Sequence, residues 1–150
     1  EAFLLEVLTE HAVTIPELGE VRATTPPVVV LTSNRTREIH DALKRRCFYH
    51  WVDYPSLDDE LDILKRKAPE AGAELSHQIV HFVHRLRDEK LFKAPGVAET
   101  IDWARTLVLL HAEALDPQMV KDTLNVILKF QEDIDNVKSE VPALTAKVSN

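Results

Sequence analysis

The chain has 150 residues, of which 45% are hydrophobic and 29% are charged, and its formal net charge is −7. This composition is typical of a globular protein with one domain or two small ones. The acidic balance argues against a general affinity for nucleic acid or for anionic membranes. No apolar run approaches the roughly 20 residues that a membrane span needs. The single cysteine, Cys47, cannot form an internal disulfide and fits the reducing cytoplasm.

The first 54 residues alternate between helical and strand-like patterns. In chain order, we expect the end of an amphipathic helix over 1–11, a hairpin-like pair of short strands over 13–25, a strand over 28–33, a helix near 37–46 and a strand over 48–54. Because a helical pattern already runs through the first residues, we expect a piece of a longer protein.

The strand over 28–33 decides the expected fold class. Its β-branched run follows two prolines and precedes polar residues, which predicts a strand buried on both faces, as in a parallel sheet. In open α/β sheets ligands lie just beyond the carboxyl ends of the strands, where Thr32, Ser33 and Asn34 fall. Asn34 is therefore either a ligand-facing residue or a helix cap, since its side chain can satisfy free backbone amides.

From Pro55 onward the pattern is helical. We expect four helices, which begin after Ser56, near residue 75, after Gly96 and at Pro117. Periodicity is lost after residue 132, which predicts a frayed end. The expected parts are the C-terminal part of an α/β core domain over 1–54, a helical domain over 55–132 and a flexible tail over 133–150.

Four blocks of sequence carry a family resemblance: FLLEVLTEHAVTIPELG, VVVLTSN, ALKRRC and APGVAETIDWARTL, in this order. They resemble the MoxR-type AAA+ ATPases, in particular the branch associated with maturation of carbon monoxide dehydrogenase. The resemblance implies an α/β fold, the second half of a P-loop AAA+ parallel-sheet domain followed by an all-α helical lid. It also implies a cytoplasmic enzyme that binds ATP and Mg²⁺ and couples ATP hydrolysis to remodelling or maturation of a client protein.

The same resemblance implies partners. Such proteins assemble into rings, typically hexamers, and act with a von Willebrand factor A-type domain protein on a client enzyme. No G-x-x-x-x-G-K-[ST] segment and no apolar strand ending in paired carboxylates occurs, and the chain has only 3 glycines. A P-loop needs glycine-rich backbone around phosphate. We therefore expect a portion that lacks both Walker motifs and is inactive by itself.

Candidate site residues follow from the resemblance. Asn34 matches sensor 1, whose amide would contact the terminal phosphate or the attacking water. Arg46 matches the arginine finger that offsets phosphoryl charge in the neighbouring subunit, with Arg45 as the adjacent alternative. Without the family, these arginines would only complement a helix C-terminal dipole. Val97 stands where the family usually has the sensor 2 arginine, and Arg105 is the candidate substitute.

Three histidines share one face of the second helix in this half of the chain. His77, His81 and His84 lie at i, i+4 and i+7, and neutral imidazoles so placed can ligate a transition metal. No cysteine or ordered set of carboxylates completes a site, so we expect a solvated or partner-facing surface and no metal.

Two other functions come from the residues alone. The chain can be a non-enzymatic helical protein-interaction module with a small sheet. A winged-helix DNA-binding domain is disfavoured because the acidic balance leaves only the basic cluster over 35–46 to meet phosphate.

Overall fold

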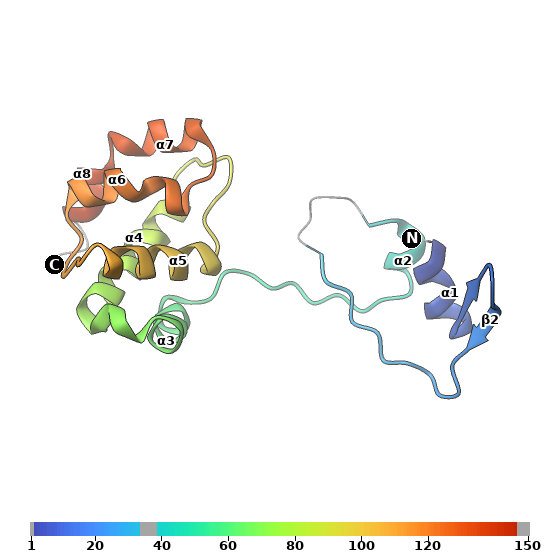
Figure 1. Cartoon of the computed structure of the whole chain (residues 1–150). Helices are drawn as coiled ribbons and strands as arrows, with labels where there is room; N and C mark the ends of the chain where they lie inside the picture. The colour runs from blue at the N-terminus through green and yellow to red at the C-terminus, as the bar shows by residue number, and fades with distance from the viewer. Residues whose placement is uncertain (1, 34–38, 147–150) are drawn as a thin grey trace. The chain divides into compact units, whose positions relative to one another are not determined.

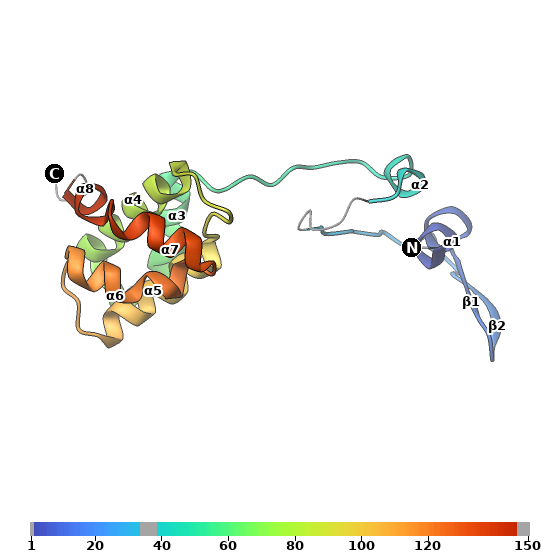
Figure 2. The same ribbon diagram turned by 90° about the horizontal axis from the view of Figure 1, so that it is seen from above.

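The computed structural model describes residues 2–33 and 39–146 and divides into two compact units. Unit 1 is Glu1–Val52 and unit 2 is Asp53–Asn150. Figure 1 shows the elements of each unit along the chain, and Figure 2 shows the same ribbon from above.

The described part of unit 1 contains two helices and one hairpin. Its elements are α1 Ala2–Glu10, β1 Ala12–Ile15, β2 Gly19–Arg22 and α2 Asp41–Lys44. The two strands pair antiparallel, with Ala12 opposite Arg22 and Ile15 opposite Gly19. Gly19 has a φ of +75° where β2 begins, a conformation that other residues adopt at a cost. The hairpin that the sequence predicts is therefore present.

The expected parallel-sheet fold is wrong. Within the described residues, the only sheet is the two-stranded antiparallel one, and neither 28–33 nor 48–54 forms a strand. Val28 is 96% exposed and Val30 is 81% exposed. The reason is that a strand buried on both faces needs partner strands and covering helices. The described part of the chain supplies neither, so an apolar run alone does not make a sheet.

Unit 2 is a bundle of helices. Its elements are α3 Leu57–Lys67, the 3₁₀ helix η1 Pro69–Ala71, α4 Gly72–Asp88, α5 Val97–Leu109, α6 Pro117–Ile127, α7 Gln131–Lys138 and α8 Val141–Ala146. Helix α4 packs against three other helices of the bundle, α3, α5 and α8. The four helices expected between 56 and 132 are present as α3, α4, α5 and α6. The presence of these four helices does not by itself make them an AAA+ lid.

Local sequence explains where these helices begin. Ser56 caps α3, because its hydroxyl oxygen accepts a hydrogen bond from the backbone N–H of Asp59 at 3.2 Å. Asp116 caps α6 in the same way, and Pro117 occupies the first helical position, where its missing N–H costs nothing. Acidic first turns and basic last turns in α3 add favourable interactions with the helix dipole.

The core of unit 2 is continuous, and its buried Trp103 side chain is hydrogen-bonded. Phe82 and Trp103 pack with ring centroids 5.3 Å apart, and the Trp103 indole N–H donates to the Thr123 hydroxyl at 2.8 Å. The core extends to the C-terminal helices, where Val137 and Val141 are buried. Gln131–Lys138 and Val141–Ala146 form α7 and α8, so most of the described part of the tail expected over 133–150 is helical. None of the helices described is both long and apolar enough to cross a membrane.

Candidate functional site

The structure distributes the predicted site residues over both units. Asn34, the sensor 1 candidate, lies outside the described residues. Arg45 and Arg46 follow each other at the end of α2 in unit 1, and Arg105 lies on α5 in unit 2. Only the two neighbouring arginines are therefore brought together by the structure as described.

Arg46 is engaged within unit 1. Its Nε donates to the Thr9 hydroxyl of α1 at 2.9 Å, and its Nη1 donates to the Ala42 carbonyl at 2.8 Å. The bond to Thr9 attaches the end of α2 to α1, and the bond to Ala42 is made to α2 itself. Arg46 thus has a structural role in this conformation, although it is the residue that the resemblance favours as the finger.

Arg45 differs from Arg46 in its contacts. Its side chain is exposed, and it makes no hydrogen bond or ion pair with any residue that the structure describes. Its backbone N–H donates to the Asp41 carbonyl at 3.0 Å, so the residue still closes the turn of α2. Of the two candidate arginines, Arg45 has the guanidinium available to an anion on another molecule.

Arg105 is used at the end of another helix. Its Nη2 donates at 2.8 Å to the carbonyl of Lys67, the last residue of α3. The last carbonyls of a helix have no partner within the helix, and a cation there is favourable. This contact gives Arg105 a capping role that needs no nucleotide.

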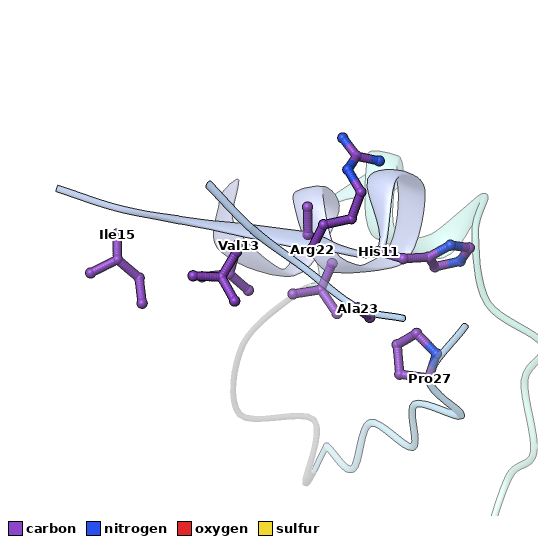
Figure 3. Close-up of a pocket in the computed structure, with 9 residues that line it drawn as sticks. His11, Val13, Ile15, Arg22, Ala23 and Pro27 are labelled. Carbon is purple, nitrogen blue, oxygen red and sulfur yellow. The ribbon is translucent and has the colours of Figure 1, made fainter. Parts of the chain in front are cut away.

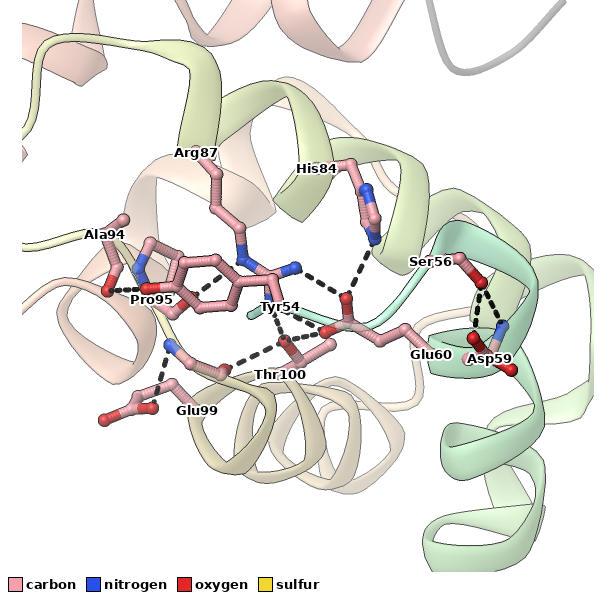
Figure 4. A network of polar contacts seen from close by, with 11 residues as sticks. Tyr54, Ser56, Asp59, Glu60, His84, Arg87, Ala94, Pro95, Glu99 and Thr100 are labelled. Atoms are coloured by element: carbon pink, nitrogen blue, oxygen red, sulfur yellow. Dashed lines mark hydrogen bonds and ion pairs between the residues drawn. The ribbon is translucent and has the colours of Figure 1, made fainter. Parts of the chain in front are cut away.

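A buried carboxylate is the centre of a polar network in unit 2 (Figure 4). The side chain of Glu60 is only 1% exposed. Arg87 donates to both of its oxygens, from Nη1 to Oε2 at 2.6 Å and from Nη2 to Oε1 at 2.8 Å. The Thr100 hydroxyl donates to Oε1 at 2.8 Å, and His84 Nε2 lies 2.9 Å from Oε2. The paired guanidinium is the bidentate geometry that carboxylates favour.

These contacts determine the ionisation of Glu60. Burial raises the pKa of the carboxyl group, but hydrogen bonds from Arg87 and Thr100 and the charges of Arg87 and His84 outweigh burial. The pKa of Glu60 is therefore lowered, and the carboxylate stays charged. With both oxygens bonded, Glu60 has a structural role and is not suited to act as a general base.

Arg87 extends the network to the start of unit 2. Its Nε donates to the Pro95 carbonyl at 2.8 Å, and its guanidinium lies 4.4 Å from the centre of the Tyr54 ring. The Tyr54 hydroxyl donates to the Ala94 carbonyl at 3.4 Å. Figure 4 shows these residues arranged around the guanidinium. One arginine thus connects α3, α4, the loop before α5 and the segment that leads into α3.

Unit 1 has an open apolar pocket of about 390 Å³ between α1 and the hairpin (Figure 3). Its lining residues are Val7, His11, Ala12, Val13, Ile15, Val21, Arg22, Ala23 and Pro27. Arg22 donates to the Glu10 carbonyl at 3.1 Å and pairs with Glu20. The pocket offers apolar surface and no arrangement of side chains for catalysis.

The three histidines of α4 do not form one group. His77 and His81 have ring centroids 4.1 Å apart. His84 instead contacts Glu60 in the buried network. The described residues contain no group of three or more histidine, cysteine, aspartate or glutamate side chains that could hold a metal ion.

The residues that the structure describes do not form a site for Mg²⁺-ATP by themselves. Its three glycines lie in separate places, at the start of β2, at the start of α4 and before α5, so they form no phosphate-binding loop. The Gly96 backbone N–H, which opens α5, already donates to the Glu99 carboxylate at 3.1 Å.

The buried network is the feature that the sequence analysis missed. Glu60 lies three residues after Leu57 and four before Leu64, on the apolar stripe of α3. A charged residue on such a stripe signals a buried ion pair, because glutamate is almost never buried without a partner. The stripe predicts that a partner exists, but α3 alone does not identify Arg87.

Comparisons with family models, with curated proteins and with solved structures find no match for this chain. The resemblance to MoxR-type ATPases therefore rests on the four sequence blocks.

Proposed function

We propose that this chain is the C-terminal portion of a MoxR-like AAA+ ATPase. In the full-length protein, ATP hydrolysis would be coupled to remodelling or maturation of a client, which the resemblance suggests is a metalloenzyme such as carbon monoxide dehydrogenase. Because the described residues form no site for Mg²⁺-ATP, the proposal assigns nucleotide binding to the preceding part of the protein. The proposed partners are further copies in a ring, a von Willebrand factor A-type domain protein and the client.

The observation that carries the proposal is the different use of two adjacent arginines. Arg46 is bonded to Thr9 and Ala42, whereas the exposed guanidinium of Arg45 has no partner among the described residues. An always-charged, planar guanidinium suits a phosphate held by another subunit. Arg45 is therefore the proposed trans-acting residue, and Arg46 is the proposed positioning residue that keeps α2 against α1.

The burial of unit 1 supports a larger assembly. Ala12 and Leu43 are the buried apolar residues of its described part, while four of its large apolar side chains are at least 80% exposed. These side chains are Val28, Val30, Phe48 and Val52. Exposed apolar surface of sufficient extent marks sites where other protein packs, and these side chains contribute apolar area to such a site. In the proposal, the preceding part of the ATPase covers them.

The test measures ATP turnover by full-length protein carrying Arg45→Ala or Arg46→Lys. We expect Arg45→Ala to retain ATP binding and to lose turnover by about 10³-fold or more. Arg46→Lys, which keeps the charge and a donor to Thr9, should retain most of the turnover. Equal turnover in Arg45→Ala and the unmodified protein would reject the trans-acting role. Absence of ATP binding by the unmodified full-length protein would reject the ATPase.

A second function, a non-enzymatic helical interaction module, is favoured by one observation. Unit 2 has its own continuous core, whereas unit 1 has almost none. A helical module of that kind needs no nucleotide. The sequence that precedes Glu1 in the gene discriminates the two, because only the ATPase requires a G-x-x-x-x-G-K-[ST] segment there.

A further inference from the structure

The contacts of α4 leave two histidines without a structural explanation. His84 is accounted for by Glu60, which it contacts at 2.9 Å. His77 is exposed and His81 is half-buried, and they lie one helical turn apart with ring centroids 4.1 Å apart. They belong to the 17-residue helix Gly72–Asp88, whose opposite face is fixed in the core. Two imidazoles are therefore held side by side on a rigid element that is open to solvent.

We propose that His77 and His81 form a two-histidine site for a divalent transition-metal cation of the Zn²⁺, Ni²⁺ or Cu²⁺ class. The inference is independent of the proposed ATPase function, and it departs from the sequence-based expectation of no metal. Histidines at i and i+4 of a helix are the spacing by which helical zinc motifs present two ligands on one face. Imidazole is also the side chain that suits these three cations.

The geometry of the pair is compatible with one shared ion. Imidazole nitrogens ligate zinc at about 2.0–2.1 Å, so two such nitrogens lie roughly 3 Å apart. Rings with centroids 4.1 Å apart can reach that separation by small side-chain rotations. Because α4 holds both backbones, little additional ordering is needed when the ion binds.

The electrostatic surroundings act in both directions. Burial lowers the pKa of His81, and the charges of His77, Arg85 and His84 lower it further. A low pKa favours the neutral imidazole that a metal requires. The Arg85 guanidinium, one turn after His81, opposes a cation. The described residues provide no third protein ligand, so water or a donor from a partner completes the coordination.

The proposal is tested by titrating the untagged 150-residue chain with Ni²⁺, followed by isothermal calorimetry and by the histidine ring signals in NMR. We expect one Ni²⁺ per chain. His77→Ala and His81→Ala should each weaken binding by more than the roughly tenfold loss that removal of an outer-shell partner causes. The matched control is His50→Ala, which removes an exposed histidine of unit 1 and should leave binding unchanged.

A second readout separates ligation from damage to the helix. Ni²⁺ should raise the melting temperature of the unmodified chain and of His50→Ala, and should not raise that of His77→Ala, because a ligand stabilises only the state that binds it. Arg85→Ala should tighten binding, since it removes the nearby cation. If His77→Ala and His81→Ala bind Ni²⁺ as strongly as the unmodified chain, the proposal is overturned. So would binding that is lost in His50→Ala.

Discussion

Replacing Arg87 with methionine removes the main partner of a buried carboxylate. Glu60 is 1% exposed and Arg87 is 7% exposed at their side chains, so solvent cannot replace the lost guanidinium. Breaking a buried ion pair by removing one partner costs about 3–5 kcal/mol. Since Thr100 and His84 still contact Glu60 in the variant, we expect a loss near the lower end, about 3 kcal/mol.

The corresponding change in melting temperature is large. A loss of 1 kcal/mol lowers the melting temperature of a domain of this size by about 4–8 °C, so the variant should melt roughly 12–24 °C lower. The control is the double variant Glu60→Met/Arg87→Met, which removes both charges. Replacing a buried ion pair with apolar residues of similar volume is often neutral, so the double variant should regain most of the lost stability.

The assay is equilibrium urea unfolding followed by tryptophan fluorescence. Trp103 is completely buried in the core of unit 2 and reports its unfolding. Trp51 is 63% exposed in unit 1, so all variants are prepared in a Trp51→Phe background. The reasoning is refuted if Arg87→Met loses less than about 1 kcal/mol. It is also refuted if the double variant is no more stable than the single one.

Three further predictions concern the stability of the two units. The pKa of Glu60 is lower in the folded state than in the unfolded state. The ionised carboxylate therefore stabilises the fold fully at a pH above the unfolded-state pKa, which is near 4.3. This stabilisation is lost as the pH falls from the unfolded-state pKa through the folded-state pKa. Urea midpoints over that range should therefore fall less in Glu60→Gln, and an identical fall would contradict the assignment. A fragment of residues 53–150 should unfold cooperatively, whereas a fragment of residues 1–52 should show no cooperative transition by circular dichroism. Asp133→Ala should cost about 1–3 kcal/mol in thermal unfolding, because the buried carboxylate accepts two backbone N–H groups; a change of less than 0.5 kcal/mol would argue against this role.

Helices α3 to α6 of unit 2 could be predicted because their signals are local. Ser56 and Asp116 cap the helices that follow them, and Pro117 lies at a first helical position, as their places in the sequence suggest. The apolar stripe of α4 likewise matches its buried face, on which Ile79 and Val83 are fully buried.

The fold class could not be predicted because it depends on non-local pairing. The apolar run over 28–33 favours burial, but it does not show that partner strands exist elsewhere in the chain. Helices α7 and α8 were not predicted for a similar reason, because their burial depends on contacts with distant parts of the chain. Asp133 is polar and offered no periodic signal, yet the residue is only 2% exposed. Its carboxylate accepts a hydrogen bond from the backbone N–H of Phe92 at 2.7 Å.

The candidate site was predicted only in part. The arginines at the end of α2 were proposed as site residues from the family resemblance, but the sequence could not show that Arg46 is bonded to Thr9 while Arg45 is not. The histidine spacing was likewise visible, whereas the pairing of His84 with Glu60 depends on how α3 packs against α4.

The most direct measurement for the proposed function is ATP turnover by mixed rings. Full-length protein carrying Arg45→Ala is mixed with full-length protein whose phosphate-binding lysine is replaced, so that one variant lacks the trans-acting arginine and the other cannot bind ATP. The account predicts that the mixture regains turnover above the sum of the two separate variants, because the arginine of one subunit serves the nucleotide of the next. A mixture no more active than that sum would contradict it.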